Sequence, residues 1–304
     1  MTSTGSGDDR LNPSQRDIAR EKATQLRLQQ KKNDRRNRWL LQGGLALVAV
    51  AIIVTVTLII VNSARPAAPG PRNMLSDGIK IGQNFEAVTT AGLKEDQSPQ
   101  PASENPADVI DIRVYVDYLC PYCGDFEAEN NKQIAAWLAE GAATLEIHPI
   151  SLLDSQSAAT QYSTRAANAA ACVANYSPNS FFAVNAALFD KQPKEGEPGL
   201  TDEQLIDLVK AAGVGNNAAK INTCIEDVQF ESWVKDATAR ALNGPIPNSD
   251  IESVKGTPTI LVNGVKYEYS FPFDAQEFAQ VVSQQVGSMF NKMTSETPAP
   301  VPAG

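Results

Sequence analysis

The sequence predicts an α/β domain with a large α-helical insertion, preceded by a single transmembrane helix. Three observations predict it. An uncharged apolar run lies near the start of the chain, and a succession of strand, helix, strand, helical block, hairpin and helix follows. Two cysteines stand where the first main strand meets its helix. The 304 residues, 42% of them hydrophobic, are enough for one or two domains with a sizeable core.

Charge is divided unevenly along the chain. Residues 1–38 contain ten Lys and Arg against five Asp and Glu, whereas the remainder contains 16 against 30. The segment 1–38 is basic and the remainder of the chain is acidic, which argues against nucleic-acid binding by the main domain. Residues 1–38 also lack an apolar stripe, and we interpret them as a cytoplasmic tail that is partly disordered.

Residues 39–61 form the predicted transmembrane anchor. Their central part, Leu45–Val61, carries no charged residue, and the whole stretch exceeds the roughly 20 residues that cross a bilayer. A cleaved signal peptide, with cleavage near Ser63 or Ala64, is the alternative. Its apolar region would normally be shorter, about 7–15 residues, and would precede an Ala-x-Ala site, so we favour the uncleaved anchor.

The orientation of the anchor follows from its flanks. Five basic residues come directly before it, and only Arg65 and Arg72 follow closely. The positive-inside rule therefore predicts a cell-membrane protein whose N-terminus is cytoplasmic and whose main domain is extracytoplasmic. The five are Lys31, Lys32, Arg35, Arg36 and Arg38.

The globular domain is predicted over residues 75–292. A Pro-rich linker, 62–74, precedes it and a Pro-rich disordered tail, 293–304, follows it. Its first part has the alternation of strands and the spacing of a helix. We predict a short strand or hairpin in Gly78–Ala91, a strand at Val109–Tyr118, a helix at Asp125–Glu140 and a strand at Thr144–Ile150.

An Ala-rich helical insertion is predicted at about 157–243. Thr201 is its clearest N-cap, because Asp202 and Glu203 follow in the first turn. The predicted helices are Ala158–Asn175, Phe181–Phe189, Thr201–Ala212 and Ala218–Leu242. A hairpin then joins Thr259–Val262 to Val265–Tyr269 through Asn263-Gly264. The last helix, Asp274–Phe290, should bury one face: Phe278, Val281, Val282, Val286 and Phe290.

The candidate chemistry lies in Cys120-Pro121-Tyr122-Cys123, which follows a strand and opens a helix. Unpaired N–H groups and the helix dipole favour a thiolate at such a position, and the thiolate is the reactive form in disulfide exchange. Cys120 is therefore the predicted nucleophile, and Cys123, one turn further on, the more buried resolving thiol. Pro121 suits the first helical turn, where its missing N–H costs least.

Three other interpretations of this motif were weighed. A zinc site needs two more ligands, but His148 is the only histidine and the other cysteines, Cys172 and Cys224, are far apart in the chain, so no metal is predicted. An inert structural disulfide is disfavoured because a two-residue loop at a helix start is strained and reactive. A cytoplasmic redox protein such as a glutaredoxin is opposed by the membrane topology.

Gly256-Thr257-Pro258-Thr259 precedes the apolar strand of the hairpin. Together with the strand, the Cys-Pro-Tyr-Cys motif and its helix, this arrangement resembles the thioredoxin superfamily. The helical insertion, the run 116–123 and the stretch 181–189 resemble its DsbA-like branch, especially the membrane-tethered members of actinobacteria. The resemblance covers roughly residues 109–290 and implies a thioredoxin fold.

The resemblance also implies roles for individual residues. Pro258 should be cis and lie beside the cysteines, leaving the Thr257 backbone free to pair with an extended substrate; Pro121 and Tyr122 support the same site. Tyr122 replaces the His that many strong oxidants carry there, so the oxidising strength is left open.

Two acids near the motif are candidates for proton transfer. Glu127 lies one turn after Cys123, although it could equally be a solvated carboxylate beside Asp125 and Glu129. Asp117, three residues before Cys120, is a weaker candidate. The strand residue His148 is assigned a structural role.

The remaining cysteines, Cys172 and Cys224, lie in the helical insertion. In an oxidising compartment two such cysteines usually pair, and DsbA-like proteins of actinobacteria often carry a second pair here. A disulfide would contribute about 2–4 kcal/mol to stability. Two buried free thiols are the alternative.

The resemblance implies a dithiol oxidase that needs no cofactor. It would introduce disulfides into unfolded or newly exported cysteine-containing proteins, and a DsbB-like or VKOR-like membrane protein would reoxidise it. An extracytoplasmic reductase or isomerase is a second hypothesis, although residues 62–108 are too short for a dimerisation domain. A non-catalytic tethered chaperone or binding module is a third.

Overall fold

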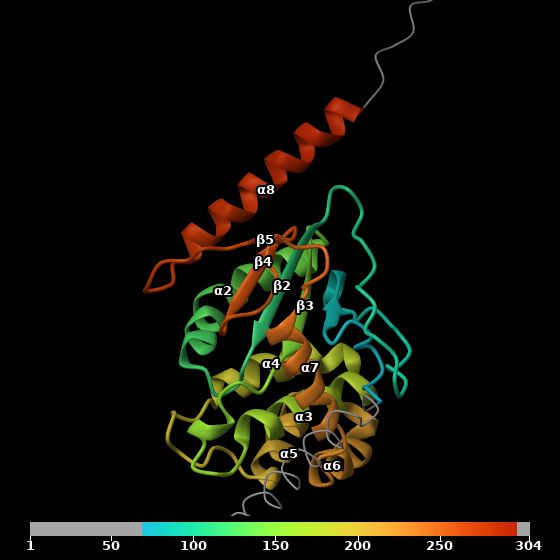
Figure 1. The fold of residues 1–304 in the computed structure, drawn as a ribbon, viewed down its shortest axis with the longest axis vertical. Helices are drawn as coiled ribbons and strands as arrows, with labels where there is room; N and C mark the ends of the chain where they lie inside the picture. The colour runs from blue at the N-terminus through green and yellow to red at the C-terminus, as the bar shows by residue number, and fades with distance from the viewer. Residues whose placement is uncertain (1–68, 297–304) are drawn as a thin grey trace, which may run out of the picture. The chain divides into compact units, whose positions relative to one another are not determined.

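A five-stranded mixed sheet, with strand order β1-β3-β2-β4-β5, lies at the centre of the fold (Figure 1). The two longest strands, β2 and β3, run parallel, whereas β4 pairs antiparallel with β2. Both faces of β2 and β3 are largely buried, although polar and charged residues alternate with apolar ones along much of each strand. The strands are β1 Ile79–Ile81, β2 Ile110–Val116, β3 Ala143–Pro149, β4 Thr259–Val262 and β5 Val265–Lys266.

The computed structural model describes residues 69–296. The chain divides into two units, Met1–Arg65 and Pro66–Gly304, and all described residues belong to the second. The predicted cytoplasmic tail, the anchor at 39–61 and the end of the C-terminal tail lie outside the described residues. Within residues 69–296, no helix is both long and apolar enough to cross a membrane.

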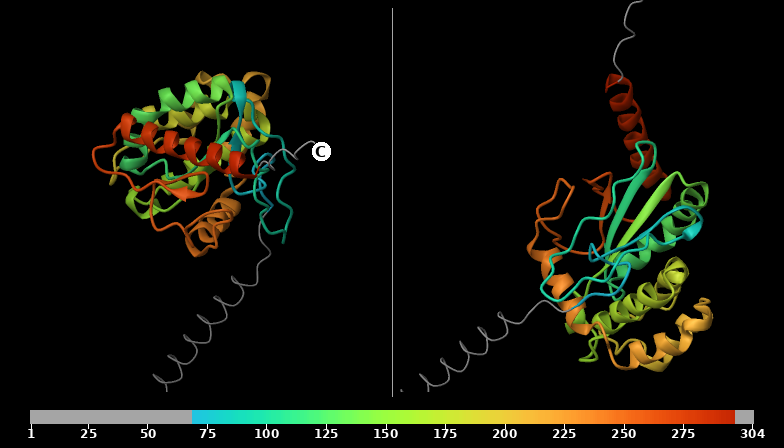
Figure 2. Two further views of the ribbon diagram at one scale, coloured as in Figure 1. Left: turned by 90° about the horizontal axis from the view of Figure 1, so that it is seen from above. Right: turned by 90° about the vertical axis from the view of Figure 1, so that its right-hand side faces the viewer.

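Helices of the insertion gather beyond the end of the sheet at which β2 leads into α2 (Figures 1 and 2). Their shared core contains small and aromatic side chains, and α3 is buried along nearly its whole length. The helices of the fold are α2 Pro121–Glu140, α3 Tyr162–Tyr176, α4 Phe181–Asp190, α5 Asp202–Ala211, α6 Ala218–Glu226, α7 Glu231–Asn243 and α8 Ala275–Glu296.

The structure corrects several predicted element boundaries. Helix α8 runs to Glu296, past its predicted end at Phe290 and into the predicted tail. The predicted helix 218–242 is two helices, because Val228 has a φ of 43° and the chain turns before α7. The helix α3 begins at Tyr162 rather than Ala158, since the preceding residues include several with positive φ. Strand β5 ends at Lys266, three residues before its predicted end at Tyr269.

The predicted cap of α5 is confirmed. The Thr201 hydroxyl accepts a hydrogen bond from Gln204 N, and the Gln204 side chain accepts one from Thr201 N, which makes a complete capping box.

The predicted apolar face of α8 is only partly correct. Phe278 and Val282 pack into the core, but Val286 is 50% exposed and Phe290 is 62% exposed. Figure 1 shows the reason: the second half of α8 extends past the sheet and has little of the domain beneath it.

A disulfide joins Cys172 in α3 to Cys224 in α6. This is the pair that the sequence predicted, and both residues are buried in the core of the insertion. The bond links helices 52 residues apart in the chain, so it restricts the unfolded chain over a long loop.

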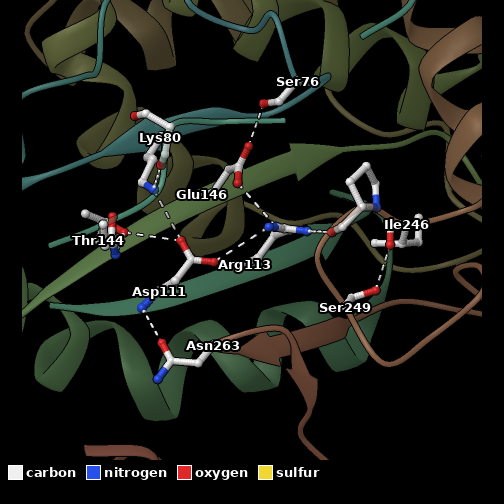
Figure 3. Close-up of polar contacts among 12 residues, drawn as sticks. Ser76, Lys80, Asp111, Arg113, Thr144, Glu146, Ile246, Ser249 and Asn263 are labelled. Carbon is white, nitrogen blue, oxygen red and sulfur yellow. Dashed lines mark hydrogen bonds and ion pairs between the residues drawn. The ribbon is translucent and has the colours of Figure 1, made fainter. Parts of the chain in front are cut away.

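A buried ion network crosses the sheet and was not predicted from the sequence (Figure 3). Lys80, Glu146 and Arg113 occupy paired positions on β1, β3 and β2 and therefore form a row across three strands. Arg113 Nε lies 3.2 Å from Glu146 Oε2, and Lys80 Nζ lies 3.5 Å from Asp111 Oδ1. Each buried charge thus has an opposite partner, as burial requires.

Glu146 is only 1% exposed and should be the most costly member of this network to neutralise. Burial disfavours its ionised form, but His148 and Arg113 outweigh burial and hold the Glu146 pKa at about 2. Because this pKa lies below the usual value of about 4.3, ionised Glu146 stabilises the fold above pH 4.3, and the stabilisation is lost as pH falls toward 2.

We expect Glu146→Gln to lower the free energy of unfolding by about 3 kcal/mol at pH 7, because Arg113 would lose its buried partner. Denaturant unfolding checks this value, and the difference from wild type should shrink between pH 4 and pH 2. The matched control is Glu231→Gln, which breaks an exposed i,i+4 pair with Lys235 and should cost about 0.5 kcal/mol or less. Equal losses in the two variants would contradict the prediction.

Candidate active site

The two cysteines of the motif lie at the start of α2 and differ in their surroundings. Cys120 is the N-cap residue and Pro121 the first residue of the helix. Cys123 lies one turn further in and is 1% exposed. Both are free thiols in this structure. The neighbouring Tyr122, in contrast, is 52% exposed, although Cys120 itself is only 4% exposed.

Thr257 and Pro258 lie beside this motif, although they are far from it in the sequence. Their peptide bond is cis, as predicted. Cys120 Sγ donates a hydrogen bond of 3.1 Å to the Thr257 carbonyl oxygen, although the two residues are 137 positions apart. The antiparallel pairing of β4 with β2 produces this contact, because it brings the beginning of β4 beside the end of β2.

The environment separates the acidities of the two thiols. A hydrogen bond from Cys123, together with the backbone N–H groups of Tyr122 and Cys123, lowers the pKa of Cys120 to about 7 against the opposing effect of burial. Burial raises the pKa of Cys123 well above its usual value, and the hydrogen bond to Cys120 adds to the rise. Cys120 is therefore the thiol suited to attack and to leave.

Glu127 differs from the other acids of α2. Asp125 and Glu129 are exposed, but burial raises the pKa of Glu127 to about 7 even though Asn131 and Asn185 donate hydrogen bonds to it. Tyr118 Oη donates to Asn185 Oδ1 at 3.0 Å and extends this polar network. A carboxyl group with such a pKa can accept or donate a proton near neutral pH, as a proton-transfer role would require.

Asp117 is fully buried, and three backbone N–H groups donate to its carboxylate. It accepts hydrogen bonds from Leu119 N at 2.8 Å, Leu152 N at 2.7 Å and Leu153 N at 2.8 Å. Burial raises its pKa, while these bonds oppose the rise. Asp117 thus connects the turn before Cys120 to the loop after β3.

His148 lies away from the cysteines, in the ion network of the sheet. Its Nε2 is 3.3 Å from Glu146 Oε1, and its ring stacks on Tyr115 with 4.4 Å between ring centroids. These contacts agree with the structural role expected from the sequence. In residues 69–296 no group of three or more His, Cys, Asp or Glu side chains could hold a metal ion.

An aromatic surface beside the motif was missed by the sequence analysis. It consists of Tyr122, Tyr269 and Phe271, and the buried ring of Phe273 packs against the last two. The Tyr122 and Phe271 ring centroids are 4.6 Å apart, and each of the two side chains is 52% exposed. Tyr269 Oη donates to the Pro258 carbonyl oxygen at 3.1 Å. The Tyr-x-Phe-x-Phe spacing was the available signal, but part of it had been assigned to the hairpin strand.

The aromatic surface adjoins a groove of about 410 Å³ that runs along the cis-proline segment. Thr257, Pro258 and Tyr269 line it, together with Lys255 and Lys266. Exposed apolar side chains beside an open groove are typical of a surface that binds another chain.

Comparison with known proteins places this geometry in a family. The family model described as thioredoxin matches residues 104–282, more than half of the chain. The chain belongs to the thioredoxin family. The predicted resemblance to its DsbA-like members is confirmed by the solved structures that this fold matches.

Two of these structures come from Mycobacterium tuberculosis. The reduced form of the disulfide bond oxidoreductase DsbG is 29% identical, with a TM-score of 0.53 over 73% of this chain and 95% of that chain. Oxidised DsbA is also 29% identical, with a TM-score of 0.52 over 72% of this chain and 100% of that one. BdbD from Bacillus subtilis, 20% identical with a TM-score of 0.51, shares the fold.

A curated relative matches only part of this chain. The serine/threonine-protein kinase PknE of Mycobacterium tuberculosis is 33% identical over 106 residues, which are 34% of this chain. The match spans 19% of the kinase, so this chain matches only a small part of that protein's length.

Proposed function

We propose that this thioredoxin-family protein is an extracytoplasmic, membrane-anchored thiol-disulfide oxidoreductase that introduces disulfides into exported proteins. The observation that carries the proposal is the asymmetry of the cysteine pair. Cys120, with a pKa of about 7, contacts the carbonyl of a cis Thr257-Pro258 unit, while the Cys123 pKa is raised by burial. DsbG and DsbA of Mycobacterium tuberculosis, both 29% identical, support the same chemistry.

The reaction would begin with the Cys120–Cys123 disulfide. A substrate thiolate attacks Cys120 Sγ, the S–S bond breaks, and Cys123 leaves as a thiolate that takes up a proton. A second substrate thiolate then attacks the substrate sulfur of the mixed disulfide and expels Cys120. Two electrons pass to the cysteine pair, and the substrate gains a disulfide. The low pKa of Cys120 makes it a good leaving group in the second step.

Substrate would bind as an extended chain along the cis-proline segment. The Thr257 backbone can pair with it, while Tyr122, Tyr269 and Phe271 offer aromatic area for its apolar side chains. Unfolded proteins suit such a surface because their backbone and apolar side chains are accessible. A DsbB-like or VKOR-like quinone-linked membrane protein would accept the two electrons and restore the disulfide.

The extracytoplasmic location is supported by the asymmetry of Lys and Arg residues around residues 39–61. Disulfide formation is also useful in such a compartment. The second candidate is a reductase or isomerase in the same place. Tyr122 favours it, because a tyrosine supplies no positive charge to stabilise the Cys120 thiolate and thus yields a weaker oxidant than a histidine would.

Trapping of mixed disulfides tests the proposal. In full-length Cys123→Ala, Cys120 can attack a substrate disulfide, but no neighbouring thiol can release the product. We expect cell-envelope proteins linked to the variant, all released by dithiothreitol, and no adducts with Cys120→Ala/Cys123→Ala. A Cys123→Ala variant that traps nothing would contradict catalysis through this pair.

The same protein distinguishes oxidase from reductase. Equilibration of the wild-type pair with glutathione gives its reduction potential, and an oxidase requires a value well above that of thioredoxin, about −270 mV. A potential near the thioredoxin value would instead support the second candidate.

A further inference from the structure

Gln192, two residues after the end of α4, contacts the turn that carries Cys120. Its Nε2 donates to the carbonyl oxygen of Cys120 at 2.8 Å and to that of Tyr118 at 3.1 Å. One amide group of the helical insertion therefore bridges two backbone carbonyls on either side of Leu119. The contact spans 72 positions in the chain and does not belong to any helix or strand ladder.

Gly124 leaves the space that this contact needs. A Cβ atom at position 124 would overlap with the Gln192 amide. Gly124 is helical and its φ is not positive, so the backbone conformation does not demand glycine there. The close approach of Gln192 supplies a specific reason for a glycine in the first turn of α2, where alanine would otherwise be the better helix former.

The same part of the insertion holds Tyr118 in a second way. Asn185, in α4, accepts a hydrogen bond of 3.0 Å from Tyr118 Oη, and the Phe189 ring lies 5.0 Å from the Tyr118 ring. Tyr118 is therefore held by its side chain and by its carbonyl group. Both contacts come from one short segment, 185–192, which limits movement of the turn between β2 and Cys120.

The bridge also bears on the charge of Cys120. Carbonyl oxygens carry partial negative charge. The carbonyl oxygens in the turn at Cys120 therefore disfavour the negatively charged thiolate of that residue. The Cys120 carbonyl already accepts from Cys123 N at 3.0 Å and Gly124 N at 3.3 Å. The Gln192 amide adds a third donor there and places positive hydrogens beside the turn, which favours the thiolate.

We propose that Gln192 is a positioning residue through which the helical insertion sets the acidity of Cys120. The inference rests on the proposed function only in taking Cys120 as the reactive thiol. Loss of the donors should destabilise the thiolate and hence the reduced pair, which makes the protein a weaker oxidant.

Three full-length variants test the proposal. Gln192→Met keeps the volume and removes the donors, Gln192→Glu places an acid beside the two carbonyls, and Gly124→Ala displaces the Gln192 amide without changing it. The Cys120 pKa is read from thiolate absorbance and from the pH dependence of alkylation. We expect it to rise by about half a unit in Gln192→Met and Gly124→Ala and by about one unit in Gln192→Glu.

The equilibrium with glutathione provides a second measurement on the same proteins. Measured at pH 9, where Cys120 is ionised in every variant, it should shift by about threefold toward the oxidised, less readily reduced pair in Gln192→Met and by about tenfold in Gln192→Glu. The matched control is Gln204→Met, which breaks the capping box of α5 but has no contact with the motif. It should weaken the fold and leave the Cys120 pKa unchanged.

Gln192→Met and Gln192→Glu proteins that titrate like wild type would overturn the proposal, as would an equal shift in Gln204→Met. If Gln192→Met does not fold, the Gly124→Ala variant decides. Neither measurement requires turnover of a protein substrate. An empty Cys123→Ala trap together with a shifted Cys120 pKa would therefore reject the proposed function and leave the role of Gln192 standing.

Discussion

Replacing Cys120 with serine is expected to abolish disulfide transfer, with a loss of about a thousandfold or more in the rate of oxidising a reduced, unfolded protein. A serine hydroxyl is not ionised near neutral pH and forms no disulfide. Cys123 cannot substitute for it, because burial raises the pKa of Cys123 well above the usual value. The regain of activity by a reduced, denatured disulfide-containing enzyme, in the presence of an oxidant, measures the rate.

The second cysteine pair provides the control for this experiment. The double variant Cys172→Ser/Cys224→Ser also removes a disulfide, but that bond joins α3 to α6 in the core of the insertion. It should lower stability by about 2–4 kcal/mol and keep its catalytic rate at temperatures where the protein remains folded. A Cys120→Ser protein that retained a tenth of wild-type activity would contradict the assignment of the nucleophile.

The sequence predicted the cysteine site because its signals are local or belong to a family. The strand, the motif and the first turn of α2 are contiguous, so hydrophobic periodicity and helix-terminus chemistry locate them. The contact between Cys120 and Thr257 spans 137 positions, and only the family resemblance predicted it. The cis bond at Pro258 came from the same source.

Features that depend on tertiary contacts were not predictable in this way. The break between α6 and α7 arises where Phe230 is buried and its N–H donates to Asn168 Oδ1 at 2.8 Å, and no glycine or proline in the local sequence marks it. The partnership of Gln192 with Cys120 has no periodic signal. Glu146 lies in an alternating strand, where a charged residue would ordinarily be assigned to the solvent side.

Glu127→Gln is expected to slow disulfide donation by about tenfold at pH 6–7, because Cys123 leaves as a buried thiolate and needs a proton. Glu127 lies one turn from Cys123, and burial raises its pKa to about 7. Below pH 7 it is protonated and can donate; above pH 7 it is ionised and cannot. The wild-type rate should therefore contain a component that declines as pH rises through 7, and Glu127→Gln should lack that component.

Stability provides an independent measurement of the same group. Because the folded-state pKa of Glu127 lies above the unfolded value of about 4.3, the proton-linked stability is fully present below pH 4.3 and is lost as pH rises through about 7. Glutamine carries no charge to bury, so Glu127→Gln should gain about 3 kcal/mol relative to wild type between pH 4 and pH 8. Denaturant unfolding at the two pH values measures the gain.

Glu129→Gln is the control for both measurements, since Glu129 belongs to the same helix but is exposed. It should change neither the pH dependence of the rate nor that of stability. The paired outcome is informative because a purely structural Glu127 would alter stability alone, while a proton donor to Cys123 must alter both. A Glu127→Gln protein with the wild-type pH–rate profile would show that the proton for Cys123 comes from water, and that the buried carboxyl group costs the fold stability without assisting the reaction.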